Sequence, residues 1–139
     1  MRPLAAWFVL ASAAFLCSCE DLPDAPDLPN APPTATVYQT PVAPIYAGQT
    51  AVAFSAVGAR DVDGNVVSFV WNFGDGTPEV ATSEPSVHHT FPDTPARCLN
   101  MVYGVLLAIV DDKGGRGFVT QNVTVTELPA PSAAECQPR

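Results

Sequence analysis

Residues 71–77 read WNFGDGT, a short stretch that contains the end of a strand and the turn that follows it. Side chains of a strand alternate between its two faces, so Trp71 and Phe73 point to one face and Asn72 points to the other. Two large aromatic side chains on one face predict that this face lies in a hydrophobic core. The stretch therefore predicts a central strand with one buried face.

The turn Gly74-Asp75-Gly76 admits two interpretations. The glycines let the chain turn where a Cβ would clash, and Asp75 can accept hydrogen bonds from backbone N–H groups. A carboxylate between glycines also occurs in metal-binding loops and catalytic turns. We favour a scaffold, because the aromatic residues before the turn assign the segment to a core strand. Any binding site is then expected on the loops around it.

The same alternation recurs along the rest of the chain from residue 34. Apolar residues share one face in four runs, at 50–54, 69–73, 103–109 and 119–125. Sequences rich in Gly, Asp and Asn separate these runs, at 63–65, 74–76 and 111–115. Short alternating strands between such turns predict an all-β fold, an immunoglobulin-like antiparallel β-sandwich of about seven strands.

The composition excludes several classes of function. The protein has 139 residues, enough for one domain, and a formal net charge of −8, with 14 acidic against 6 basic residues. Such a surface repels phosphate backbones, so nucleic acid is not an expected partner. No nucleophile, zinc-protease or phosphate-loop motif is present, and the adjacent His88 and His89 point to opposite faces of a strand. We therefore expect a protein without catalytic activity.

Residues 1–18 have the features of an export signal. A positive charge precedes the apolar run from Leu4 to Leu16, which suits a signal peptide and is too short to span a bilayer comfortably. The sequence Leu-Cys-Ser-Cys that ends at Cys19 resembles a bacterial lipobox, which implies that Cys19 is acylated. An ordinary secretory peptide is the alternative. The resemblance implies a bacterial cell envelope, with the outer membrane favoured over the inner because Glu20 follows the cysteine.

Residues 19–33 are expected to be a linker that follows the acylated cysteine. Within it, DLPDAPDLPNAPP at 21–33 repeats with a period of three, which is the number of residues in one turn of a polyproline II helix. We interpret it as a semi-rigid spacer, and a ligand for a proline-binding or peptidoglycan-associated partner is the alternative. Residues 128–139 are expected to form a C-terminal tail.

Four motifs along the chain have a common order and spacing. They are DVDGNV at 61–66, WNFGDGT at 71–77, HTF at 89–91 and YGVLLAIVD at 103–111. With these motifs, residues 34–127 resemble a polycystic kidney disease (PKD) domain, whose fold is a seven-stranded sandwich. The resemblance implies a set of structural motif residues: Trp71, Phe73, Gly74, Asp75, Gly76, His89 and Tyr103. It also implies that His89 has a hydrogen-bonding role in the scaffold.

Acidic residues gather in two of the predicted turns, with Asp61 and Asp63 in one and Asp111 and Asp112 in another. Calcium binds clustered carboxylate and carbonyl oxygens. Some PKD domains that accompany bacterial collagenases bind calcium near the first of these loops, and this resemblance adds Asn30 as a candidate ligand. Ordinary turn chemistry, in which Asp and Asn stabilise tight turns, is the alternative.

Besides the acylated Cys19, two cysteines, Cys98 and Cys136, remain after the signal peptide is removed. The strands over 99–110 and 118–126 are expected to form a hairpin, which brings Cys98 close to the end of the second strand. The tail beyond that strand is long enough to return to this point, and an exported protein meets oxidising conditions. We predict a Cys98–Cys136 disulfide, with two buried free thiols as the alternative.

These features together predict a lipid-anchored, non-catalytic, extracytoplasmic module that contacts a protein or a polysaccharide at a bacterial cell envelope. The alternatives are a structural or assembly subunit of an envelope complex and an accessory to a secreted hydrolase. The membrane is an expected partner through the N-terminal lipid. Phe118 is the candidate for an exposed aromatic contact residue, because it begins the last strand out of phase with Val119 and Val123.

Overall fold

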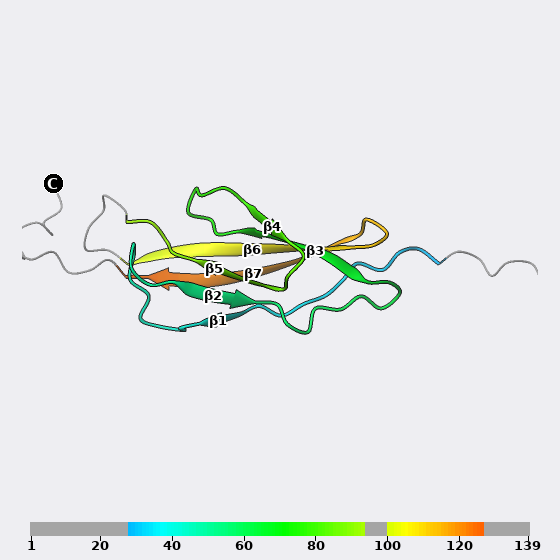
Figure 1. Cartoon of the computed structure of the whole chain (residues 1–139), viewed down its shortest axis with the longest axis horizontal. Coiled ribbons are helices and arrows are strands. Elements are labelled where there is room, and N and C mark those ends of the chain that lie inside the picture. The colour runs from blue at the N-terminus through cyan, green and yellow to red at the C-terminus, as the bar shows by residue number, and fades with distance from the viewer. Residues whose placement is uncertain (1–27, 94–99, 127–139) are drawn as a thin grey trace, which may run out of the picture.

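The computed structural model describes residues 28–93 and 100–126. In these ranges the chain forms seven strands, which confirms the predicted all-β class (Figure 1). The strands are β1 (Tyr38–Thr40), β2 (Val52–Ser55), β3 (Val66–Asn72), β4 (Val80–Thr82), β5 (Ser86–His89), β6 (Met101–Asp111) and β7 (Arg116–Val125).

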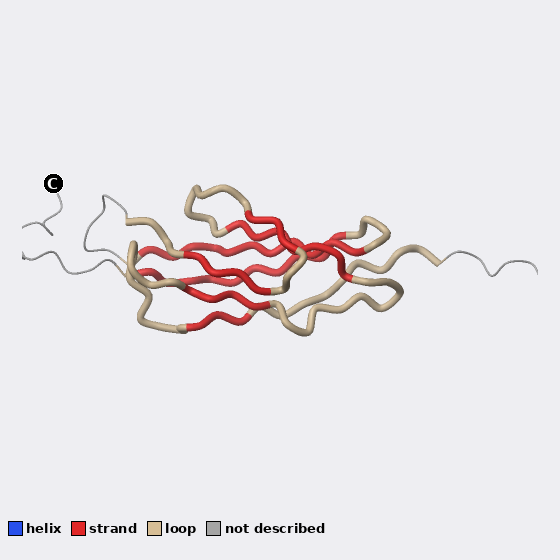
Figure 2. The backbone as a smooth tube through the Cα atoms, in the orientation of Figure 1, coloured by secondary structure: helices blue, strands red, loops and turns tan. Residues whose placement is uncertain are grey.

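The strands form two antiparallel sheets that pack face to face (Figure 2). One sheet has the order β1-β2-β5 and the other has the order β4-β3-β6-β7. The predicted hairpin is the long pair β6–β7, in which Val110 lies opposite Arg116 and Met101 lies opposite Val125. Strand β3, which carries the start of WNFGDGT, lies between β4 and β6 and is therefore central, as the sequence predicts.

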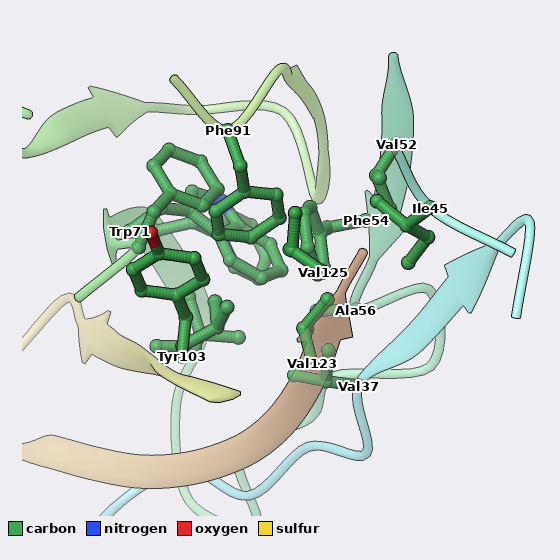
Figure 3. Packing of buried hydrophobic residues seen from close by; sticks show 14 of the residues in the cluster. Val37, Ile45, Val52, Phe54, Ala56, Trp71, Phe91, Tyr103, Val123 and Val125 are labelled. Atoms are coloured by element: carbon green, nitrogen blue, oxygen red, sulfur yellow. The ribbon is translucent and has the colours of Figure 1, made fainter. Parts of the chain in front are cut away.

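The core lies between the two sheets and is built around aromatic side chains. Trp71, Phe73, Phe54 and Phe91 are completely buried. The ring of Phe54 lies 6.0 Å from that of Trp71 and 5.5 Å from that of Phe73, centroid to centroid, so β2 of one sheet interlocks with β3 of the other. Figure 3 shows side chains from both sheets meeting in this cluster. Burial of such large rings is the main favourable contribution to the stability of a small sandwich.

The segment that precedes β1 also packs against the sandwich. Pro33 is buried, and Thr34 exchanges backbone hydrogen bonds with Arg60. The last residues of the expected linker, from residue 30 on, therefore contact the domain. Cys19, Cys98 and Cys136 lie outside the described residues, so the acylation and the disulfide stay predictions. None of the described residues belongs to a helix that is long and apolar enough to cross a membrane.

Candidate functional site

The glycine turn, residues 74–77, is held by a carboxylate that has no exposed surface. Asp75 Oδ1 accepts hydrogen bonds from the backbone N–H of Thr77 (3.0 Å) and from the Thr77 hydroxyl (2.6 Å). Its other oxygen, Oδ2, lies 2.6 Å from His89 Nε2. Gly74 has a φ of 72°, and a Cβ at this position would lie 2.7 Å from the carbonyl oxygen of Gly104, so the turn requires glycine.

The contact between Asp75 and His89 links the turn to the core. Burial opposes ionisation of Asp75, but the hydrogen bonds from Thr77 and His89 outweigh it and lower the pKa of this carboxyl. An ionised carboxylate only accepts hydrogen bonds, so Nε2–H of His89 is the donor. The imidazole stacks on the Phe73 ring, with centroids 3.7 Å apart, and meets the Phe91 ring edge to face at 4.9 Å. Both oxygens of Asp75 therefore serve the scaffold.

A second acidic group lies at one end of the sandwich, at the right in Figure 1. It consists of three segments that are far apart in the sequence: residues 30–31 before β1, the loop 61–65 before β3 and the turn 111–115 between β6 and β7. We call this group the acidic end. The structure brings all five predicted calcium ligands into it: Asn30, Asp61, Asp63, Asp111 and Asp112.

Asp111 is the buried member of the acidic end, with 2% of its surface exposed. Its carboxylate accepts hydrogen bonds from the side chain of Asn30 (2.9 Å) and from the backbone N–H groups of Lys113 (2.9 Å) and Gly115 (2.7 Å). Burial raises the pKa of Asp111, but these hydrogen bonds outweigh it, and the net pKa is lowered. Asp111 thus closes the β6–β7 turn and fixes the N-terminal segment to it.

Asp63 is compensated by the basic side chain of Lys113. Lys113 Nζ lies 3.0 Å from Asp63 Oδ2 and donates to the Asp63 carbonyl at 2.6 Å. This hydrogen bond lowers the pKa of Asp63 and raises that of Lys113. Both side chains keep contact with solvent, so the pair is screened and contributes little to stability.

Asp61 has no ion pair like that of Asp63 with Lys113 among the described residues. Its Oδ2 atom is buried and has no hydrogen-bond partner among the described residues. A Cβ at Gly64 would lie 2.6 Å from this oxygen and would also collide with Oδ1 of Asp112, so the two carboxylates converge above the glycine. Burial and the negative charge of Asp63 raise the pKa of Asp61. Asp112 receives one hydrogen bond, from the side chain of Asn65 at 3.1 Å.

The acidic end has the oxygen donors that calcium prefers, but their arrangement is incomplete. No three His, Cys, Asp or Glu side chains within residues 28–93 and 100–126 are placed to hold one metal ion. Lys113 holds Asp63, and Asn30 presents its Nδ2 atom rather than its oxygen to Asp111. The oxygens of Asp61 and Asp112 that face each other across Gly64 are the pair that fits a cation. Calcium binding therefore stays a prediction.

Two aromatic side chains are exposed in the described part of the chain. Phe118 is 63% exposed, as the sequence predicts, and lies opposite Ala108 on the outer face of the larger sheet. Tyr38 on β1 is 62% exposed and lines a groove beside β7. Tyr38 was not among the residues predicted from the sequence. The available signal was its position next to the apolar Val37, which places the two side chains on opposite faces of a strand.

Known proteins share features with part of this chain. Residues 35–94 match the model of the PKD domain. A collagenase, ColQ1 of Bacillus cereus (strain Q1), is 32% identical over 76 residues, which is 55% of this chain but only 7% of the collagenase.

Several solved structures are similar, and three of them illustrate the range. The first, whose title describes the promiscuous specificity of carbohydrate-binding modules from the β-sandwich superfamily, has a TM-score of 0.62 and 27% identity over 73% of this chain and 37% of that one. The PKD1 domain of Vibrio anguillarum Epp has a TM-score of 0.51 and 25% identity over 71% of this chain and 99% of that one. The PKD1 domain of the Vibrio cholerae metalloprotease PrtV, at 24% identity and a TM-score of 0.51 over 69% of this chain and 99% of that one, agrees in fold.

The family match and the structure agree. The match ends at residue 94, and strands β6 and β7 beyond it complete the sandwich. The motif residues Trp71, Phe73 and His89 lie within the match and build the core and its turn. Residues 35–94 of this chain therefore match the PKD domain in sequence, and the β-sandwich agrees with the fold of solved PKD domains.

Proposed function

We propose that the protein is a lipid-anchored, non-catalytic module that binds a polysaccharide at a bacterial cell envelope. The observation that carries this proposal is the contrast between its polar groups and its exposed aromatic ones. Asp75 and His89 are used within the scaffold, whereas Tyr38 stands exposed at a groove that is also lined by amide and hydroxyl side chains. Exposed aromatic rings beside amide and hydroxyl groups are suited to sugars, which present C–H faces and hydroxyl edges.

The comparisons support the same class of ligand. The similarity to a structure of carbohydrate-binding modules supports a polysaccharide. The similarity to a collagenase supports the two alternatives, contact with a protein or service as an accessory to a secreted hydrolase. Polysaccharide binding is favoured because the described surface offers aromatic and uncharged polar groups together.

The membrane anchor is supported by the Leu-Cys-Ser-Cys sequence that ends at Cys19. Labelling cells with a fatty-acid analogue should mark the wild-type protein, and the Cys19→Ala variant should be unlabelled and released from the membrane fraction. The matched control is Cys17→Ala, which should keep the label. Labelling of the Cys19→Ala variant would refute acylation at this residue. Separation of inner and outer membranes then tests the expected preference for the outer membrane.

Ligand binding is tested with the full-length protein in detergent, incubated with insoluble cellulose, chitin and xylan and with immobilised collagen. Retention on at least one polysaccharide is the expected result. Retention on collagen alone would instead support the protein-binding alternative. A concentration-dependent increase in size by light scattering, without retention on any of these materials, would support an assembly subunit.

A second function is favoured by one specific observation at the acidic end. The buried oxygen of Asp61 has no hydrogen-bond partner and faces Asp112 across Gly64. We infer that calcium binds there, with Asp61 and Asp112 as ligands and Asp63, Asp111 and Asn30 close by. A native-state ligand must raise the melting temperature. An identical Tm in millimolar calcium and in chelator would refute this second function.

A further inference from the structure

A groove of about 500 Å³ lies between β1 and β7, strands that stand at the edges of different sheets. Its lining residues come from β1, the segment after it and β7: Val37, Tyr38, Gln39, Val42, Ala43, Pro44, Ile45, Gln121, Asn122, Thr124 and Thr126. We call it the edge groove. Its volume falls within the roughly 300–1,000 Å³ of typical small-molecule sites, so a short stretch of a sugar chain fits.

We propose that the edge groove is the binding site of the protein and that it takes a neutral glycan chain. The inference rests on the proposed polysaccharide function and adds to it the location and the ligand class. Its first support is charge. The protein carries a net charge of −8, yet none of the residues that line the groove is charged. An anionic glycan would find no ion-pair partner there and would be repelled by the rest of the surface.

The second support is the hydrogen-bonding capacity of the lining. Gln39, Gln121 and Asn122 each carry an amide, and Thr124 carries a hydroxyl. Both groups donate and accept hydrogen bonds, as do the hydroxyl groups of a sugar. Such a lining therefore matches a ligand that is polar and uncharged at once. A peptide strand would instead use the backbone of the β7 edge and would depend little on these side chains.

The third support is an unsatisfied atom in the groove. Gln39 Nε2 donates to the carbonyl oxygen of Val42 at 3.3 Å, whereas Gln39 Oε1 is buried and has no hydrogen-bond partner in the described residues. Buried polar atoms without a partner are rare because they cost free energy. If the amide of Gln39 turned toward the groove, a hydroxyl group of a bound sugar would donate to this oxygen and remove the cost.

The fourth support is the aromatic ring at the groove. Tyr38 is 62% exposed and, like Gln39, is one of the residues that line the groove, so an aromatic ring and an amide belong to the same site. Phe118 is equally exposed, but it lies on the open outer face of the larger sheet and is not one of the groove residues. Because only Tyr38 of these two residues lines the groove, Tyr38 is the aromatic platform for a sugar ring.

The test is affinity electrophoresis of the full-length protein in detergent. The gels contain a neutral polysaccharide (hydroxyethylcellulose, xylan, galactomannan or glycol chitin) or anionic polygalacturonate, and the retardation of the protein measures its affinity. Tyr38→Ala is expected to weaken binding to the preferred neutral glycan by about tenfold, as for other aromatic contact residues. Phe118→Ala is the matched control, because it removes an equally exposed ring, and is expected to change affinity less than about twofold. Both side chains are exposed, so both variants should fold.

A second variant separates binding from folding. Gln39→Leu removes the unpartnered oxygen and is expected to weaken glycan binding while the Tm stays equal to or above that of the wild type. Loss of glycan binding in Phe118→Ala but not in Tyr38→Ala would overturn the edge groove and leave the polysaccharide function standing. Tighter binding to polygalacturonate than to every neutral glycan would overturn the ligand class. Binding to none of the polysaccharides would refute the proposed function itself.

Discussion

The glycine turn and the acidic end are both built from Asp and Gly, yet their carboxylates are in opposite states. In the glycine turn, Asp75 has a hydrogen-bond donor for each of its oxygens. In the acidic end, Asp61 has a buried oxygen without a partner, and its negative neighbour Asp63 is compensated by one exposed lysine. The pKa of Asp75 is lowered, whereas that of Asp61 is raised.

This difference shows how to separate a structural carboxylate from a candidate ligand. A carboxylate whose donors come from its own turn and from the core stabilises the fold, and its loss leaves those donors unpaired. A carboxylate held beside other negative charges destabilises the fold unless something positive joins it. Asp75 belongs to the first kind and Asp61 to the second.

The largest expected effect comes from breaking the glycine turn. Asp75→Ala should lower the free energy of unfolding by about 2–3 kcal/mol, because the donors of Thr77 and His89 lose their buried acceptor. Urea denaturation measures it. Glu84→Ala, which removes an exposed carboxylate between β4 and β5, is the control and should stay within about 0.5 kcal/mol of the wild type. An equally small loss for Asp75→Ala would contradict the scaffold role.

The next effect tests whether a cation completes the acidic end. Millimolar calcium should raise the Tm of the wild-type protein relative to chelator, and Asp61→Asn should abolish this rise. Glu79→Gln, a neutralisation outside the acidic end, is the control and should keep the calcium response. A calcium response that persists in Asp61→Asn would exclude Asp61 as a ligand.

Lowering the pH should change the stability contributed by Asp75 and by Asp61 in opposite directions. The lowered pKa of Asp75 gives stability that is present above the ordinary carboxyl pKa and is lost as the pH falls below about 4. The raised pKa of Asp61 has the opposite effect, since stability is lost as the pH rises through its raised value. In chelator, Asp61→Asn should therefore be more stable than the wild type at neutral pH and lose this advantage in acid. Thermal melts across pH 3 to about 7 measure it, and a constant difference at every pH would contradict it.

The smallest effect is expected for the exposed pair of Lys113 and Asp63. Lys113→Met should leave the Tm in chelator almost unchanged, because an exposed ion pair is screened by water. The same substitution should strengthen calcium binding, since it frees Asp63 and removes a competing positive charge. Arg116→Met, which removes a basic side chain just beyond the turn, is the control. Weaker calcium binding in Lys113→Met would argue against a cation beside Asp63.

The strands could be predicted because their signals are short-range. The alternation of Trp71 and Phe73 with Asn72 is enough to predict a buried face, and the glycines after them predict the turn. The hairpin around Lys113 and Gly115 follows in the same way from two alternating runs with a turn between them. The exposure of Phe118 was also predictable, because its phase in β7 sets the face it occupies.

Contacts between distant segments could not be predicted in this way. Asp75 was expected to serve its own turn, but the partner for its second oxygen is His89 on a different strand. The edge groove joins β1 to β7 from opposite ends of the domain, so no local pattern marks it. The amide of Gln39 acquires its unpartnered oxygen only through burial in that setting.

By itself, then, the sequence determined the strand periods, the turns and the acidic balance of the protein, because alternation and turn chemistry act over a few residues. The tertiary structure decided which carboxylates are compensated and where a concave surface exists. Asn30 reaches Asp111 across 81 positions, and only the packed sandwich brings them together. Charge compensation and concavity depend on distances through space, which residue order alone leaves open.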